Sequence, residues 1–143
     1  MKFLDKHGYC IISTVNPGLN SPQSTLVRYA NDDLILYILS AKERRKVTNI
    51  GINPKVSMVV YGRSLLIPPS SLIIWGSAKI LEEDDKEAVR VFNSKRFPTS
   101  WINSQAIKRA RKRSKVIFIR VDPERFRLNQ FKHGFISGEV MDV

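Results

Sequence analysis

Short runs of β-branched and apolar residues, separated by clusters of proline, glycine and asparagine, constrain the fold of this chain most strongly. Three such runs, Tyr9–Val15, Gln23–Tyr29 and Leu34–Leu39, lie near its start. Residues 16–22 and 31–33, which separate them, are rich in turn-forming types. This composition is typical of strands, and links this short join antiparallel neighbours. The sequence therefore predicts an antiparallel meander over this region.

The period of the pattern changes in the next segment. Residues 41–50 lack glycine and proline and are dense in helix formers, so they predict a helix that ends before Gly51. Strands are predicted again at Lys55–Tyr61 and Leu72–Leu81. The adjacent prolines within 62–71 predict a loop between these two strands.

The second half of the chain adds helices and further strands. Gly76 stands inside a strand pattern and predicts a bend, a bulge or the close approach of another backbone. The acidic cluster Glu82–Asp85 predicts the start of a helix that runs through Phe92, and Ser100 predicts the cap of another helix that reaches about Arg113. Two last strands are predicted around the Asp122-Pro123 turn, at Val116–Val121 and Arg125–Phe131.

These elements predict a single domain over residues 1–143 that is mainly β (α+β), with six to seven antiparallel strands in a barrel and helices packed outside it. A chain of 143 residues can bury a sizeable core without disulfides.

The single cysteine, Cys10, excludes an internal disulfide and is expected in the core. The sequence contains no cluster of cysteine and histidine for structural zinc. No apolar run approaches membrane-span length, so we expect a cytoplasmic protein without a metal site.

Net charge is the unusual feature of the composition. The chain carries 24 lysines and arginines against 13 acidic residues, which gives a net charge of +11. Such a charge favours anionic partners, for example nucleic acid or phosphorylated cofactors. The segment Lys108–Lys115 holds six basic residues in eight. It is either a contact for a polyanion or a solvated helix face without a specific partner.

A second basic segment lies at the start of the first long helix. Ser40 ends a strand and is followed closely by Lys42, Arg44, Arg45 and Lys46. Free backbone N–H groups at a helix N-terminus, together with several cations, suit a phosphate group. A solvated basic helix start is the alternative interpretation.

The order of several motifs is similar to that of the FMN-binding split-barrel family, which includes pyridoxamine 5'-phosphate oxidase. Lys46–Ser57 resembles the family's lysine, short helix, asparagine-proline turn and valine-serine strand start. Further segments resemble its second and third strands, its glycine-x-alanine strand and its tryptophan…glutamine helix; they are Pro22–Tyr29, Leu36–Ser40, Ile74–Leu81 and Trp101–Gln105. The resemblance spans about Phe3 to Phe131 and implies a split β-barrel.

The resemblance also implies a homodimer that binds FMN at its interface. It assigns the phosphate to Lys46 and Arg45, with Leu39 and Ser40 on the phosphate side of the flavin. It places the second strand along the isoalloxazine ring and ribityl chain, and it adds two polar contacts, Gln105 being offered across the dimer. The cofactor-binding residues implied in this way are Gln23, Ser24, Thr25, Leu26, Val27, Arg28, Leu39, Ser40, Arg45, Lys46, Ser71 and Gln105.

Two departures from the oxidase branch shape the functional expectation. Gln23 stands where that branch has arginine, and the C-terminal segment lacks its arginine-x-histidine-x-x-arginine motif. We therefore expect an FMN-dependent oxidoreductase on an unknown small molecule rather than a pyridoxine-phosphate oxidase, with no catalytic residue visible in the sequence. An F420-dependent reductase, a haem-binding relative and a non-enzymatic module for nucleic acid or another polyanion remain alternatives. Dimerisation is also expected because Leu65–Ile67 and Trp75 would expose much apolar surface.

Overall fold

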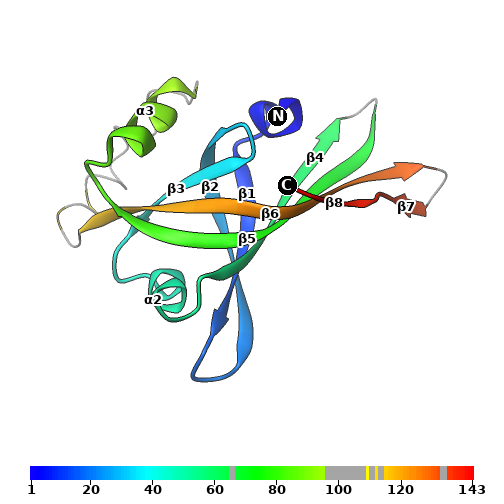
Figure 1. The fold of residues 1–143 in the computed structure, drawn as a ribbon. Helices are drawn as coiled ribbons and strands as arrows, with labels where there is room; N and C mark the ends of the chain where they lie inside the picture. The colour runs from blue at the N-terminus through cyan, green and yellow to red at the C-terminus, as the bar shows by residue number, and fades with distance from the viewer. Residues whose placement is uncertain (65–66, 96–108, 110–111, 113–114, 133–134) are drawn as a thin grey trace.

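Eight strands and three helices make up the described part of this computed structural model (Figure 1). The structure describes residues 1–64, 67–95, 109, 112, 115–132 and 135–143. The elements are, in order, α1 (Lys2–Lys6), β1 (Tyr9–Asn16), β2 (Ser21–Asp32), β3 (Ile35–Ala41), α2 (Arg45–Ile52), β4 (Lys55–Ser64), β5 (Ile67–Glu82), α3 (Lys86–Ser94), β6 (Val116–Lys132), β7 (Phe135–Ser137) and β8 (Val140–Asp142). Most of the helix expected over Ser100–Arg113 lies outside the described residues.

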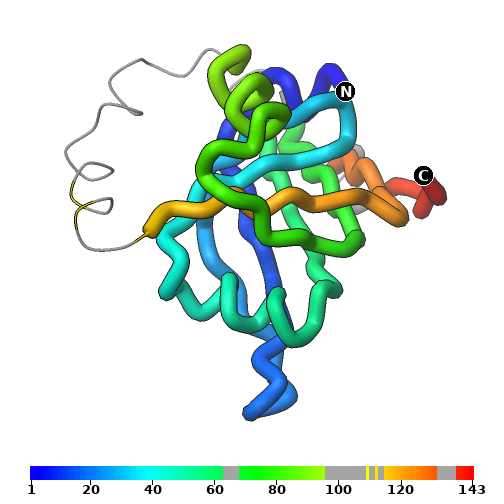
Figure 2. The backbone as a smooth tube through the Cα atoms, turned by 60° about the vertical axis from the view of Figure 1, so that its left-hand side comes forward, coloured from blue at the N-terminus to red at the C-terminus, as the bar shows by residue number. Residues whose placement is uncertain are grey.

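The strands form an antiparallel barrel. They follow the order β3-β2-β1-β4-β5-β6-β7, and the sheet closes because β3 also pairs with β6, while the short β8 pairs with β6 as well. Helix α2 packs against β1 and β5, and α3 packs against β2 and β3. The two helices therefore cover different parts of the barrel (Figures 1 and 2). This arrangement confirms the mainly β split-barrel fold with flanking helices.

Alternation along the strands defines the core. On β1, Cys10, Ile12 and Thr14 are buried, while the residues between them face outward. Successive strand residues point to opposite faces, so this period of two separates the interior of the barrel from its outside. The same interior contains Met58 and Ile74 from β4 and β5. Cys10 is therefore a core residue as expected, and burial raises the pKa of its thiol to about 12.

The loop predicted over 62–71 is wrong for its described residues; Leu65 and Leu66 lie outside them. Strand β4 continues to Ser64 and β5 begins at Ile67, so Pro68 and Pro69 lie within a strand. The ladder between β5 and β6 begins only at Ser70, and the β4 side carries a register shift between Gly62 and Ser64. The prolines thus lie where β5 has one neighbouring strand, a position in which a missing N–H is tolerated.

The turn predicted at Asp122-Pro123 is also wrong, because β6 runs without interruption from Val116 to Lys132. The chain bends there instead of reversing. The register between β5 and β6 shifts between Trp75 and Gly76, opposite Pro123. The expected irregularity at Gly76 is therefore confirmed as a bulge with a close backbone approach.

Gly76 offers a direct test of this packing. A Cβ atom at Gly76 would lie 2.2 Å from the Asp122 carbonyl oxygen, which belongs to backbone and cannot rotate away. We expect Gly76→Ala to lower the free energy of unfolding by about 1–3 kcal/mol, the usual cost of overpacking. Chemical denaturation measures this difference. Gly51→Ala is the control, because nothing lies within 4 Å of a Cβ at Gly51, and an equal effect of both changes would contradict the close approach.

The helix boundaries agree with the sequence only in part. Asp85 caps α3 by accepting a hydrogen bond from the Ala88 backbone N–H at 3.0 Å, whereas Glu82 still belongs to β5. The helix predicted over 41–50 begins four residues later, at Arg45, and continues through Gly51. The short helix α1 has no counterpart in the sequence prediction.

Candidate functional site

The start of α2 carries a concentration of positive charge. Strand β3 ends at Ala41, and the Lys42 backbone N–H donates to the Lys115 carbonyl at 2.8 Å, which anchors the turn into α2. Arg44 is the N-cap, and its side chain makes no capping hydrogen bond. The first N–H groups of a helix have no partner within the helix. Together with the positive end of the helix dipole, they favour an anion at this position.

Lys46 is the distinctive side chain at this helix start. It is half-buried, and burial lowers the pKa of its ammonium group, with a further contribution from the charge of Arg44. Among the described residues, no carboxylate forms an ion pair with Lys46, Arg44 or Arg45. A cation that is partly desolvated and lies next to a second cation is stabilised by an anionic ligand. This segment therefore meets the electrostatic requirements of a phosphate site.

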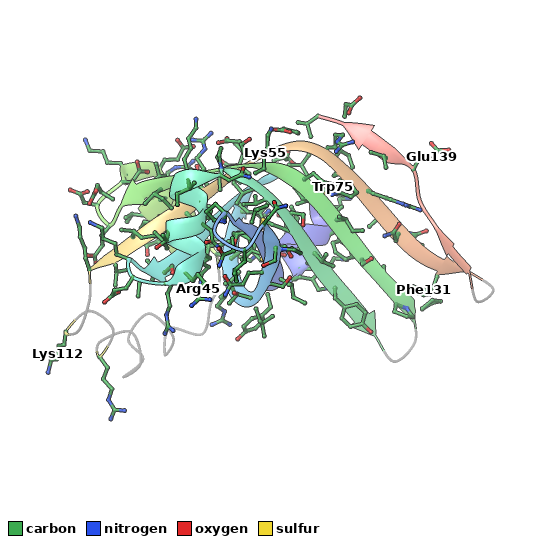
Figure 3. The ribbon with its side chains drawn as sticks, turned by 90° about the horizontal axis from the view of Figure 1, so that it is seen from below. Arg45, Lys55, Trp75, Lys112, Phe131 and Glu139 are labelled. Carbon is green, nitrogen blue, oxygen red and sulfur yellow. The ribbon has the colours of Figure 1, made fainter. Side chains whose placement is uncertain are left out.

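The neighbouring candidates from β3 and α2 lie close in sequence but differ in exposure. Arg45 projects from the first turn of α2 at the molecular surface (Figure 3). Ser40 is buried near the end of β3 and donates its hydroxyl hydrogen to the Ala41 carbonyl at 3.1 Å. Leu39 packs against a cluster beneath α3 that includes Tyr37 and Phe118. Of these residues, Arg45 is the one with a freely accessible polar group.

Gln23 is joined to α2 by a polar contact that the sequence did not predict. The Asn49 side-chain amide donates to Thr14 Oγ1 at 3.0 Å and to Gln23 Oε1 at 3.2 Å. Asn49 and Thr14 are both buried. The contact joins Gln23 to Asn49, which lies about one helical turn from Lys46 on α2, so two candidate residues from different parts of the chain lie on neighbouring elements. The sequence signal for this contact was Asn49 itself, a polar residue between the apolar Val47 and Ile50 on a short helix.

The remaining candidates on β2 divide between the two faces of the strand. Thr25 and Val27 face the interior side, whereas Ser24, Leu26 and Arg28 face outward. Ser24 shares a hydrogen bond of 2.8 Å with Ser13, and the Arg28 guanidinium lies 4.9 Å from the centre of the Tyr9 ring. Leu26 has an exposed fraction of 67 %.

Leu26 begins an apolar row that crosses the outside of the barrel. The register pairs Leu26 with Ile11, Ile11 with Val59 and Val59 with Ile73. We call these four residues the apolar row. Trp75 lies two residues further along β5 (Figure 3). The Arg125 guanidinium lies 5.4 Å from the centre of the Trp75 ring. The apolar row crosses β2, β1, β4 and β5 without interruption. It therefore forms one continuous apolar patch, whereas apolar residues exposed singly are common on protein surfaces.

The comparisons with known proteins agree with this fold. The family model described as pyridoxamine 5'-phosphate oxidase matches residues 1–130. The chain belongs to this family. A comparison with curated proteins gives no significant sequence match.

Solved structures support the family's fold for this chain. General Stress Protein 26 from Bacillus anthracis is 19 % identical, covers 99 % of this chain and 94 % of its own, and gives a TM-score of 0.67. An FAD-binding protein from Mesorhizobium loti is 19 % identical over 89 % of this chain and 88 % of its own, with a TM-score of 0.69. A heme-binding protein from Mycobacterium smegmatis is 12 % identical over 94 % of this chain and 52 % of its own, also with a TM-score of 0.69.

Ser71 does not join the other candidates of this pyridoxamine 5'-phosphate oxidase family member within one chain. It lies on β5, three strands from β2 in the sheet order. There it pairs with Tyr61 and Asn129, and its hydroxyl oxygen accepts a hydrogen bond from the Asn129 amide at 3.4 Å. Gln105 lies outside the described residues. The described candidates therefore divide into a group on α2, β2 and the end of β3, and Ser71, which lies on β5.

The basic run Lys108–Lys115 is described only in part. Arg109 and Lys112 are exposed, and Lys115 forms an ion pair of 2.7 Å with Glu82. Within the part of the chain that the structure describes, no group of three His, Cys, Asp or Glu side chains could hold a metal ion. No helix among these residues is long and apolar enough to cross a membrane.

Proposed function

We propose that this family member binds FMN and acts as an oxidoreductase on a small molecule. The observation that carries the proposal is the half-buried Lys46, which has no carboxylate partner among the described residues and lies at an uncapped helix start beside Arg44 and Arg45. FMN carries a doubly negative phosphate, which this arrangement would stabilise. The FAD-binding neighbour supports a flavin of some kind.

The residues around α2 and β2 fit the chemistry of the cofactor. Lys46 and Arg45 would hold the phosphate, with the Gln23 amide as a further donor. The Thr25 hydroxyl, on the same face of β2 as Gln23, provides a polar partner for a hydroxylated chain, whereas Ser24 lies on the opposite face of the strand. Leu26 adds an exposed apolar side chain that suits a flat ring, whereas the Val27 side chain is buried in the core and leaves only its backbone for the cofactor. FMN supplies the redox chemistry when bound, so the protein needs only to bind and orient it. The family resemblance adds Arg28, Leu39 and Ser40 to the residues that we assign to the cofactor site.

We further propose that the active form is a homodimer. The apolar row would be covered by a second copy of the chain, since an isologous contact places the same surface of both copies at a two-fold axis. Tyr9 and Tyr61, with exposed fractions of 52 % and 56 %, lie on the same strands and would extend the interface. Ser71, which lies on β5, would then contact the cofactor of the partner, and Gln105 would be offered across the dimer as the family resemblance implies. The cytoplasmic location stays a prediction.

The alternatives differ in how far the structure supports them. F420 and a polyanion were expected to use the Lys108–Lys115 run, most of which lies outside the described residues, so both stay predictions. A haem iron would need an open histidine nitrogen. His7 Nδ1 contacts the Phe3 carbonyl at 2.7 Å, and a Cβ placed on Gly62 would lie 2.6 Å from His7 Nε2, so both nitrogens face protein. His7 therefore does not favour a haem role.

Absorbance spectroscopy tests the cofactor assignment. Purified protein titrated with FMN is expected to shift the oxidised-flavin bands and to saturate at one flavin per chain. Riboflavin, which lacks the phosphate, is expected to bind more weakly because it makes no contact with Lys46. If the flavin bands neither co-purify with the protein nor shift on titration, the assignment is wrong.

A further inference from the structure

The buried contact between Asn49, Thr14 and Gln23 is not explained by any cofactor contact assigned above. Asn49 has an exposed fraction of 2 % and therefore cannot touch a ligand at the surface directly. It lies on α2, whereas Thr14 and Gln23 face each other on β1 and β2. The amide thus joins the helix that carries Lys46 to the strand that carries most of the other candidates.

An asparagine at position 49 lowers the stability of the protein unless its side-chain amide forms hydrogen bonds. Asparagine is a poor residue for a helix interior, because its side chain competes for backbone hydrogen bonds. A buried amide without partners would add a desolvation cost. Both N–H groups of Asn49 are satisfied, at 3.0 Å by Thr14 and at 3.2 Å by Gln23. These two hydrogen bonds offset the cost and make a specific connection between the helix and the two strands.

The connection fixes the rotation of α2 about its axis. Val47 and Ile50 hold the helix to the core, but apolar burial is not directional. The helix has eight residues and no side-chain cap, so its own hydrogen bonds hold it weakly. Lys46 and Asn49 are three residues apart and therefore lie on adjacent parts of the helix surface. Fixing Asn49 directs Lys46, even though the charge of Arg44 opposes a second cation there.

The connection also sets the orientation of the Gln23 amide. Because Asn49 donates its hydrogen, Gln23 must present Oε1 to it. The two N–H donors of Gln23 are then directed away from Asn49. Gln23 is only partly buried, so these donors can reach a ligand. A donor at this position suits an acceptor such as a phosphate oxygen of the cofactor.

We propose that Asn49 is a positioning residue for the phosphate site, acting through Lys46 and Gln23 without touching the cofactor. The inference rests on the proposed FMN function and names the residue that would make the site selective for a phosphorylated flavin. Thr14 serves as the fixed acceptor on the barrel wall.

A comparison of two flavins tests this role. Asn49→Ala is expected to weaken FMN binding about tenfold, while riboflavin binding stays unchanged because riboflavin has no phosphate to be positioned. In a Lys46→Ala background, Asn49→Ala is expected to cause a smaller further loss of FMN affinity than in the wild type, because only the contribution through Gln23 remains. Equal losses for the two flavins, or the same loss in both backgrounds, would show that Asn49 has only a structural role.

Two further variants control for folding. Thr48→Ala changes the exposed neighbour of Asn49 on the same helix and is expected to leave both affinities unchanged. Gln23→Ala removes one of the two contacts at a partly exposed position, so it tests the inference even if Asn49→Ala does not fold. It is expected to reduce FMN affinity and to leave riboflavin affinity unchanged. A loss of both affinities in Gln23→Ala would overturn the positioning role.

A measurement on the protein without cofactor separates this inference from the proposed function. Burial and Arg44 lower the pKa of Lys46, and a freed α2 would let its ammonium group reach water. NMR titration of Lys46 is therefore expected to show its pKa rising toward the ordinary lysine value in Asn49→Ala but not in Thr48→Ala. An unchanged pKa in folded Asn49→Ala overturns the inference. If the wild-type protein binds no FMN, the proposed function is overturned. The NMR titration alone then tests whether Asn49 positions Lys46.

Discussion

Replacing Lys46 with alanine is expected to weaken FMN binding by about ten- to hundredfold. A charge-assisted hydrogen bond to phosphate contributes roughly 1.5–3 kcal/mol, which corresponds to this range of affinity. The apo-protein should change its free energy of unfolding by no more than ~0.5 kcal/mol, because Lys46 has no carboxylate partner among the described residues to lose. Flavin fluorescence titration measures the affinity, and thermal or chemical denaturation measures the stability.

Lys112→Ala is the matched control for this experiment. It removes the same charge from an exposed position in the basic run, where no flavin contact is expected. A uniform electrostatic field would make the two variants lose affinity equally, and that result would rule out a specific phosphate site at Lys46. A salt titration adds a second comparison, since a contribution from the general field falls as ionic strength rises.

The strand pattern was sufficient to predict the barrel but not the points where its strands bend. Apolar alternation identifies β1 and β4 within a few residues of their observed ends. The same rules placed breaks at Pro68-Pro69 and at Pro123, and both are wrong. Proline prevents a strand only where its N–H would be needed by a neighbour, and that depends on which strand lies on each side. Gly76 correctly predicted an irregularity in β5, because a backbone atom that lies close to Cα excludes any side chain at that single position.

The candidate site was predictable to the extent that its residues are close in sequence. The cations around Lys46 and the helix start that they flank are visible in a single segment. The contact of Asn49 with Thr14 and Gln23 joins positions 35 and 26 residues apart, so no local pattern contains it. The apolar row could not be predicted for the same reason. Its residues become neighbours only through the register of the strands; they are Leu26, Ile11, Val59 and Ile73.

The apolar row leads to a second large effect, on assembly. Leu26→Asp is expected to weaken the proposed homodimer by at least about a hundredfold, because burying unpaired carboxylates costs several kcal/mol. Two-fold symmetry would place the new carboxylate in both copies of the interface. The fold of one chain should be little affected, since the Leu26 side chain is largely exposed in the monomer. Light scattering at micromolar concentration measures the mass.

Leu19→Asp is the matched control for this change. Leu19 lies at the tip of the same hairpin, is exposed to 72 % and stands outside the apolar row. It should leave both the dimer and the flavin affinity intact. Leu26→Asp should reduce flavin affinity together with dimerisation, since the partner completes the cofactor site and Leu26 itself is assigned to the flavin ring. A monomeric wild type would contradict the dimer itself. A dimer that survives Leu26→Asp would place the contact on another face of the barrel, and flavin binding by the monomer would show that one chain suffices for the site.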